Sequence, residues 1–350
     1  MGISIRFDDA PKGEKNLITD VPGVLVGHKT IAHGEIQTGV TALLPHGGDL
    51  FHEKVPAAVH VINGFGKSSG LMQVQELGTI ETPLLLTNTL SVGACFYALA
   101  RYMVERNPDI CDTTCSVNPM VLECNDSVLN DTRGFHVTQE DAYESLAAAD
   151  SDFEEGAVGG GRGMCCYQMK GGIGSASRVV CLDGRNYCIG ALVMTNFGSM
   201  KDLVIAGDPI GERLTKTLER EADKGSIITV LATDIPLTGR QLARIARRAV
   251  IGISRTGGHT SSGSGEVVVA FSTGNRMPHG RGSDILSWQV LSEKAIDKIF
   301  RPAIGCVEEA VISSLFHAET VKGRAGHTVK ALGEIIDLED YCRSRQNEME

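Results

Sequence analysis

Short apolar runs bounded by turn-forming residues predict a set of β-strands along the chain. Each run is shorter than an ordinary helix and is rich in aliphatic and β-branched residues, which fit a buried pleated surface. The strands are expected at residues 57–62, 178–182, 188–195, 226–233 and 266–273.

A helical repeat of apolar positions is clearest at residues 238–254, where Leu242, Ile245 and Ala246 fall on one face. A second helix is expected over residues 297–319. Strands and helices are mixed without a strict β-α-β alternation, which disfavours a doubly wound parallel sheet. The pattern favours an α/β (α+β) fold with a layered α/β/β/α architecture.

The most charged interior segment, residues 208–225, ends directly before the apolar run at 226–233. Charge-dense residues beside a glycine usually form exposed loops that are open to cleavage, so we expect such a loop here. The junction Gly225–Ser226 therefore places a flexible residue and a hydroxyl nucleophile at the mouth of a buried strand.

Cleavage of the Gly225–Ser226 bond would give Ser226 both a hydroxyl and a free α-amine. An α-amine has a pKa of about 7.7–8.0, which suits a general base near neutral pH. One residue would then supply nucleophile and base. The cut itself can be autocatalytic, through attack of the Ser226 hydroxyl on the Gly225 carbonyl. A Gly-Ser pair before a strand is also a common turn ending, so these two residues alone do not indicate self-cleavage. Further catalytic residues must be found elsewhere in the sequence.

Three further residues supply candidate partners. Ser264 and Glu266 are two positions apart, so an extended chain points them to the same side. Ser264 can relay a hydrogen bond to the Ser226 amine while Glu266 orients it; the alternative is a Gly/Ser turn with an exposed glutamate. Asn196 follows an apolar run, where its amide can donate to an oxyanion or can cap a turn.

An acidic segment at 122–131 contains Glu123, Asp126 and Asp131 beside two asparagines. This cluster can bind a substrate ammonium or a cation, or it can shape turns. Its spacing does not match the calcium-binding loop of an EF-hand.

Composition narrows the class of protein. The net charge of −10 disfavours a general nucleic-acid binder, which needs a basic patch for the phosphate backbone. The first 17 residues lack the apolar region of a signal peptide, and no run of 18 apolar residues suggests a membrane span. The ten cysteines form no C-x-x-C pair, so most are expected to be buried, reduced thiols without a metal. We therefore expect a cytoplasmic protein.

Six blocks of the sequence, in order, resemble the L-aminopeptidase/D-amidase/esterase family, which includes the β-aminopeptidases. The resemblance extends over most of the chain. The blocks are "ITDVPGVLVGH" (18–28), "VPAAVHVINGFGK" (55–67), "ETPLLLTNTLSVG" (81–93), "KGGIGSASR" (170–178), "GSIITVLATDIPL" (225–237) and "GSGEVVVAFST" (263–273).

The resemblance implies a hydrolase of the N-terminal-nucleophile type, with a four-layer α/β/β/α sandwich related to the ornithine acetyltransferase fold. It implies one catalytic domain, 1–350, which cleaves itself into an α chain, 1–225, and a β chain, 226–350. By this likeness Ser226 is the nucleophile, Ser264 and Glu266 assist it, and Asn196 helps to form the oxyanion hole. The family assembles as homo-oligomers, commonly tetramers of the αβ unit, and no cofactor is expected.

The family pattern also points to substrate-binding residues. Glu123 is the candidate for the substrate's amino group. Asn125 stands where some members carry a tyrosine, which leaves the preference among amide, ester and β-peptide substrates open. Asn63 is a candidate pocket residue or, equally, a turn asparagine before Gly64.

The function expected on these grounds is a self-processing serine aminopeptidase that acts on short peptides, amides or esters through an acyl-enzyme on Ser226. One alternative is acyl transfer to an amine on the same fold, although the related acetyltransferases use threonine as the nucleophile. Another is a non-catalytic protein whose glycine-rich loops hold a small ligand, which would remain one intact chain.

Overall fold

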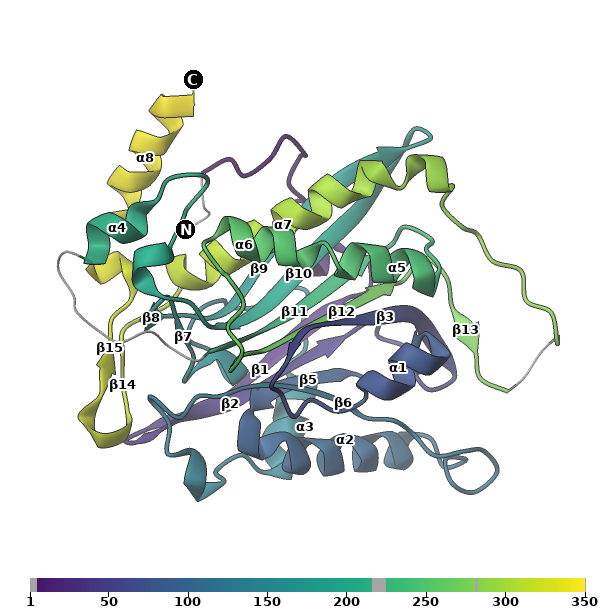
Figure 1. Ribbon diagram of the computed structural model, residues 1–350. Coiled ribbons are helices and arrows are strands. Elements are labelled where there is room, and N and C mark those ends of the chain that lie inside the picture. The colour runs from purple at the N-terminus through teal and green to yellow at the C-terminus, as the bar shows by residue number, and fades with distance from the viewer. Residues whose placement is uncertain (1–4, 216–224, 281–282, 350) are drawn as a thin grey trace.

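The protein folds into four layers, with two β-sheets packed face to face between two layers of helices (Figure 1). The computed structural model describes residues 5–215, 225–280 and 283–349. The α/β/β/α architecture expected from the order of strands and helices is confirmed.

The larger sheet contains the strand that begins at Ser226. Its strands follow the order β13-β3-β12-β11-β10-β9, and β4 pairs with β3 outside this path. β11 and β12 run parallel, whereas the other neighbours run antiparallel. The strands are β3 (Glu53–Gly64), β4 (Thr79–Ile80), β9 (Gly172–Leu182), β10 (Arg185–Asn196), β11 (Ser226–Thr233), β12 (Gly265–Ser272) and β13 (Met277–Pro278).

The smaller sheet has the order β1-β2-β5-β6, and β5 and β6 run parallel. Two short hairpins, β7-β8 and β14-β15, lie outside both sheets. These strands are β1 (Leu25–His33), β2 (Ile36–Leu44), β5 (Leu84–Asn88), β6 (Met120–Cys124), β7 (Cys165–Cys166), β8 (Met169–Lys170), β14 (Val321–Lys322) and β15 (Thr328–Val329).

Helices cover the outer face of each sheet (Figure 1). α5, α6 and α7 lie on the larger sheet, and α2 and α3 lie on the smaller one. The helices are α1 (Leu71–Leu77), α2 (Val92–Arg106), α3 (Gln139–Ala147), α4 (Ile210–Thr215), α5 (Gly239–Ala246), α6 (Ala249–Arg255), α7 (Asp297–Phe316) and α8 (Leu338–Met349).

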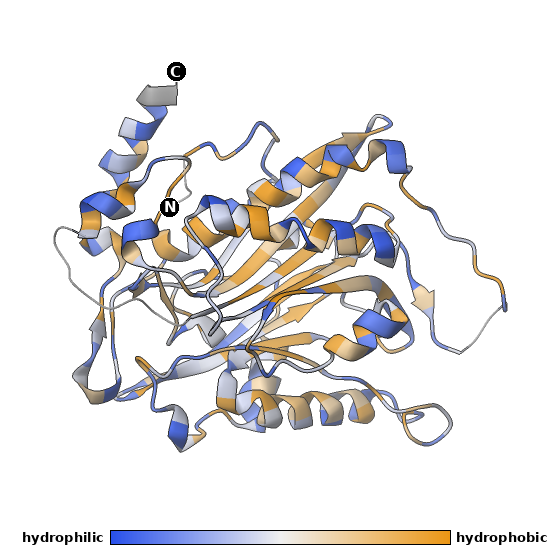
Figure 2. Cartoon of the chain, in the orientation of Figure 1, coloured by the Kyte–Doolittle hydropathy of each residue, from blue (hydrophilic) through white to orange (hydrophobic). Residues whose placement is uncertain are grey.

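The alternation of side chains along β11 shows how the layers are held together. Ile228 and Val230 face the core between the two sheets, whereas Ile227 and Leu231 face the core beneath the helices. In Figure 2 the central strands are mostly orange, the colour of hydrophobic residues, whereas the covering helices alternate between orange and blue. A strand buried on both faces needs apolar residues at nearly every position, which explains the unbroken run after Ser226.

All five predicted strands are present, but the predicted helix at 238–254 is wrong in one respect. It is divided into α5 and α6 at Arg247 and Arg248. The two halves have different neighbours, because α5 packs on β3 and α6 packs on α7. Gly252 lets α6 approach closely, since a Cβ there would lie 2.7 Å from the Ile304 carbonyl oxygen. The apolar repeat continues across the break, so the sequence pattern does not indicate that the helix is divided.

Two other boundaries differ from the sequence-based expectation. The C-terminal helix α7 ends at Phe316, three residues before the predicted end. The expected loop at 208–225 begins with helix α4, so it is not a loop throughout. Residues 216–224 of that segment lie outside the described residues.

All ten cysteines are free thiols, and six of them are buried, as expected from their apolar neighbours. Among the described residues, no helix is long and apolar enough to span a membrane.

Candidate active site

Six of the predicted site residues lie where strands of the larger sheet begin or end: Asn63, Asn196, Gly225, Ser226, Ser264 and Glu266. β11 and β12 start at this end of the sheet, and their antiparallel neighbours β10 and β3 finish there. The register places Asn196 opposite Ser226, Glu266 beside Ile227, and Asn63 opposite Glu266. Sheet pairing therefore brings together residues that are far apart in the sequence.

Ser226 is the first residue of β11 and is only 8% exposed. Its Oγ accepts a hydrogen bond from the backbone N–H of Gly265 at 3.0 Å. Because β11 and β12 run parallel, their first residues lie side by side, and this contact follows from the register. This hydrogen bond thus fixes the position of the Ser226 hydroxyl at the start of β11.

Ser264 and Glu266 interact as their spacing predicts. Ser264 Oγ donates to Glu266 Oε1 at 2.7 Å, and Thr260 Oγ1 donates to the other carboxylate oxygen at 2.8 Å. Glu266 is 2% exposed, so the alternative of an exposed glutamate on a turn is wrong. Two hydroxyl donors offset part of the cost of burying this carboxylate.

Asn196 ends β10 with its side chain bonded at both ends. Its Oδ1 accepts the backbone N–H of Cys165 at 2.9 Å, and its Nδ2 donates to the Asn125 carbonyl oxygen at 2.9 Å. An amide nitrogen carries two N–H groups, so one bond leaves a second donor. Asn196 therefore joins β7 to the segment after β6, beside Ser226, and does not simply cap a turn.

Glu123 lies in β6 of the smaller sheet, which contacts β11 across the interior. It is 3% exposed. Its Oε1 accepts the backbone N–H of Lys67 at 2.8 Å, and its Oε2 accepts the Thr89 hydroxyl. These two neutral donors hold a buried carboxylate whose remaining lone pairs suit a cationic group.

The other acidic residues of the 122–131 segment do not join Glu123. Asp126 accepts hydrogen bonds from Asn130 and Thr132, each at 3.0 Å, and burial raises the pKa of its carboxyl to about 6. Asp131 pairs with His136 at 2.9 Å. The three carboxylates therefore bind separate partners, and the local contacts of Asp126 and Asp131 agree with the alternative that this part of the segment shapes turns.

Asn125 and Asn63 have local structural partners. Asn125 is exposed, and its Oδ1 accepts the Ser127 N–H at 2.9 Å, a turn contact. Asn63 Nδ2 donates to the carbonyl oxygens of Ser261 and Ser262, each at 3.2 Å, and of Ser264. Asn63 thus anchors the loop before β12. A contact of either residue with substrate stays a prediction.

Gly225 precedes Ser226 where the backbone is crowded. A Cβ at this position would clash with the Asn196 carbonyl oxygen and lie 2.5 Å from Phe197 Cα. Its φ is not in the left-handed region. Glycine is therefore needed here because the backbone passes close to the end of β10, and not because of an unusual backbone angle.

Replacing Gly225 by alanine is expected to slow self-cleavage by more than about tenfold, because the added methyl displaces the scissile carbonyl from the nucleophile. Appearance of the two fragments on a denaturing gel measures this rate. Gly47→Ala is the control, since a Cβ there meets nothing within 4 Å. Wild-type processing of Gly225→Ala would contradict the steric argument.

Several contacts of this site come from residues that the sequence did not single out. Gly265 and Cys165 act through backbone N–H groups, which leave no trace in a sequence pattern. Thr260 lies in a loop and Thr89 begins a short 3-10 helix, and both act through their hydroxyls. The strand register accounts for the Gly265 contact, whereas the others depend on how segments outside the larger sheet meet the site.

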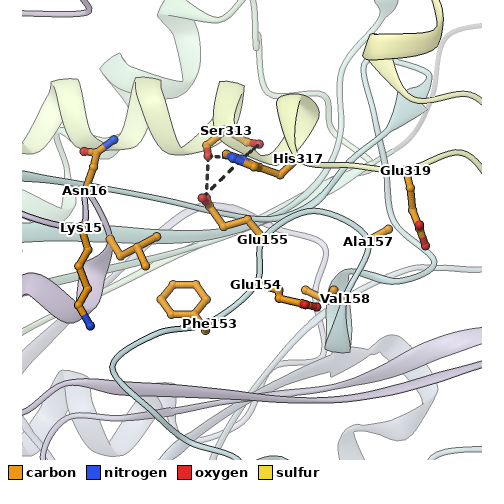
Figure 3. Close-up of a pocket in the computed structure, with 11 residues that line it drawn as sticks. Lys15, Asn16, Phe153, Glu154, Glu155, Ala157, Val158, Ser313, His317 and Glu319 are labelled. Atoms are coloured by element: carbon orange, nitrogen blue, oxygen red, sulfur yellow. Dashed lines mark hydrogen bonds and ion pairs between the residues drawn. The ribbon is translucent and has the colours of Figure 1, made fainter. Parts of the chain in front are cut away.

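A separate cavity of about 580 Å³ contains none of the predicted site residues. Figure 3 shows Ser313, His317 and Glu155 converging on its wall. His317 Nδ1 lies 3.0 Å from Ser313 Oγ and 3.5 Å from Glu155 Oε1, while Ser313 Oγ donates to Glu155 Oε2 at 2.7 Å. A catalytic relay uses opposite ring nitrogens for serine and carboxylate. Here one nitrogen faces both groups, so this cluster is not a serine-histidine-carboxylate triad.

Comparisons with known proteins show which proteins this chain is similar to. A β-peptidyl aminopeptidase of Sphingosinicella microcystinivorans is 38% identical, over 94% of this chain and 88% of that protein. A solved structure from Pyrococcus horikoshii OT3 superposes with a TM-score of 0.93 at 48% identity, covering 99% of this chain and 98% of that one.

A second solved structure identifies the fold. The L-aminopeptidase D-Ala-esterase/amidase of Ochrobactrum anthropi, described as a prototype for the serine aminopeptidases and a variant of the Ntn hydrolase fold, has a TM-score of 0.90. It is 37% identical and covers 99% of this chain and 97% of that one. The model of peptidase family S58 matches residues 16–329. The protein therefore has an Ntn hydrolase fold and belongs to peptidase family S58.

Proposed function

We propose that this protein is a self-processing serine aminopeptidase that removes N-terminal residues from short peptides, amides or esters through an acyl-enzyme on Ser226. Membership of a peptidase family with aminopeptidase relatives supports the reaction class. The single observation that carries the proposed roles is the position of Ser226 at the start of a buried strand, beside the Gly265 N–H and opposite Asn196.

Self-cleavage would proceed by attack of Ser226 Oγ on the Gly225 carbonyl carbon. The C–N bond breaks, an ester forms to Oγ, and the nitrogen of Ser226 takes up the proton and becomes a free α-amine. Water then hydrolyses the ester, which leaves a carboxylate on Gly225 and restores the hydroxyl. The products are an α chain, 1–225, and a β chain, 226–350, which together make one catalytic domain.

Substrate hydrolysis would repeat the same chemistry on a second carbonyl. The free amine of Ser226 accepts the hydroxyl proton as Oγ attacks, and then passes it to the leaving amine or alcohol. The second N–H of Asn196, with nearby backbone N–H groups, would donate to the oxyanion. Water resolves the acyl-enzyme and releases the N-terminal residue.

Ser264 and Glu266 would position the base. Ser264 uses its hydroxyl hydrogen on Glu266, so its oxygen lone pairs can accept an N–H from the Ser226 amine. The Glu266 charge favours the protonated amine, whereas burial favours the neutral amine. Only the neutral amine can accept the proton of the Ser226 hydroxyl.

Glu123 would bind the ammonium group of the substrate. Glu123→Gln keeps the size of the side chain but removes its charge, so KM for substrates with a free N-terminus is expected to rise by about 10- to 100-fold with little change in kcat. Steady-state kinetics on an aminoacyl p-nitroanilide measures this split. Asp131→Asn is the control, because Asp131 pairs with His136 instead. An unchanged KM for Glu123→Gln would remove this role.

N-terminal sequencing of the purified protein tests the proposed function most directly. We expect two fragments, of which the smaller starts with Ser-Ile-Ile-Thr-Val. A fully active intact chain would refute the proposal, and an inactive intact chain would favour the non-catalytic alternative. An added amine acceptor that captures the acyl group in preference to water would favour the acyl transferase.

The processed protein is proposed to work in the cytoplasm, without a metal or organic cofactor, as a tetramer of αβ units. The outer side of α2 supports self-association, because Phe96, Tyr97 and Val104 are 41%, 60% and 43% exposed there. Native mass spectrometry would give the number of αβ units.

A further inference from the structure

Lys170 is a fully buried lysine next to the proposed site, and the proposed function gives it no role. It is the second residue of β8, opposite Cys165 of β7, and its relative exposure is 0%. Its Nζ donates to the carbonyl oxygens of Gly161 at 3.0 Å, Met164 at 2.7 Å and Gly171 at 2.7 Å. The three N–H donors of an ammonium are thereby all used.

Among the described residues, no carboxylate lies within 4.0 Å of Nζ, so the group has no counter-ion there. Burial lowers the pKa of Lys170 to about 7, whereas the three carbonyl acceptors favour the ammonium, the form that has three N–H donors. A buried charge without an ionic partner destabilises the folded state unless other groups satisfy it. Methionine would fill similar space without a buried charge. A lysine here therefore suggests that its contacts with the three carbonyl oxygens have a specific role.

The contacts lead to Asn196 through one peptide group. Met164 supplies the carbonyl that Lys170 binds, and the N–H at the other end of that same peptide, on Cys165, donates to Asn196 Oδ1 at 2.9 Å. A cation on the carbonyl polarises the peptide and strengthens its N–H as a donor. The Asn196 carboxamide is thereby fixed with its oxygen toward Cys165 and its nitrogen toward the Asn125 carbonyl.

The turn of the β7-β8 hairpin, which bears Lys170, has an unfavourable backbone conformation. Tyr167 and Gln168, which join β7 and β8, both have positive φ, at 51° and 61°. Two-residue turns of this kind favour Asn-Gly or Gly-Gly, and bulky residues there carry strain. Contacts outside the turn must therefore keep the hairpin in place, and the ammonium of Lys170 is one of them.

We propose that Lys170 is a positioning residue for the reaction at Ser226: its buried ammonium holds the Met164–Cys165 peptide in the orientation that fixes the Asn196 carboxamide. The inference rests on the proposed function, because it assumes that Asn196 donates to the oxyanion. Lys170 touches neither Ser226 nor substrate in this scheme, and it acts only through Asn196.

A double-mutant cycle with Lys170→Met and Asn196→Ala tests the coupling. Lys170→Met alone is expected to lower kcat by about 10- to 100-fold, because small displacements of a catalytic group have effects of this size. KM should stay within about twofold, since substrate binding is not altered. In the Asn196→Ala background, the same lysine substitution should change kcat by less than about twofold. Rates are expressed per processed chain, counted on a denaturing gel.

Arg178→Met is the matched control for loss of a buried cation. Arg178 is 1% exposed and pairs with Asp8 and Glu309 at 2.8 Å and 2.7 Å, far along β9 from the site. It should lower the melting temperature but leave kcat per processed chain within about twofold, because substitutions away from a catalytic group act on stability. If Lys170→Met does not fold, Lys170→Gln replaces it in the same cycle.

The outcomes separate the inference from the proposed function. An equal loss of kcat in both backgrounds, or no loss with Lys170→Met, would overturn the positioning role while Asn196 keeps its own. A wild-type rate for Asn196→Ala would remove the oxyanion role from the proposed function, and the inference with it. If Lys170→Met lowers kcat in the wild-type background but not in the Asn196→Ala background, the result supports both the positioning role of Lys170 and the oxyanion role of Asn196.

Discussion

Ser226→Ala is expected to remain a single chain of 37.3 kDa and to lose hydrolytic activity by at least about 10⁴-fold, the scale on which a serine nucleophile contributes. The effect is large because one hydroxyl is proposed to attack both the Gly225 carbonyl and the substrate. A denaturing gel and a chromogenic amide substrate report the two losses separately.

Ser313→Ala is the control for this experiment. Ser313 is also a buried serine, and it lies beside a histidine and a glutamate, yet its geometry does not form a relay. We expect normal processing and activity from this variant. Two fragments from Ser226→Ala would mean that another protease makes the cut.

The second large effect is expected at Asn196. Asn196→Ala removes the side-chain donor proposed for the oxyanion, and kcat should fall by about 10²- to 10³-fold while KM changes little. Self-cleavage should slow as well, because both reactions develop negative charge on a carbonyl oxygen. Steady-state kinetics and a processing time course measure the two effects.

Asn107→Ala provides the comparison for Asn196. Asn107 is 3% exposed and its Nδ2 also donates to a backbone carbonyl, that of Met103 at 3.1 Å, but it lies at the end of α2. Its loss should affect stability and not kcat. Equal kinetics for Asn196→Ala and wild type would exclude Asn196 from the oxyanion hole.

Local pattern was sufficient for the parts of the site that depend on neighbours in sequence. The apolar run after Ser226 predicted a strand, and the two-residue spacing of Ser264 and Glu266 predicted their contact. The position of Asn196 at the end of an apolar run predicted that it would close a strand. Each of these follows from the alternation of side chains along an extended chain.

Features set by tertiary contacts were not accessible in the same way. The break between α5 and α6 depends on where α7 lies, and the Gly265 N–H reaches Ser226 only because β11 and β12 pair in parallel. Proximity in sequence was also a poor guide, since Glu123, Asp126 and Asp131 are close in sequence but bind different partners. Propensity describes segments, whereas the site is defined by how segments meet.

The place of β11 in the larger sheet has a consequence for the processed enzyme. β11 is an interior strand, bonded on one side to β10 and on the other to β12. A cut before Ser226 would leave β10 on one polypeptide and β11 on the other, and the two strands would stay paired along eight residue pairs. The two pieces would then denature as one cooperative unit and could not be exchanged between molecules without melting the central sheet.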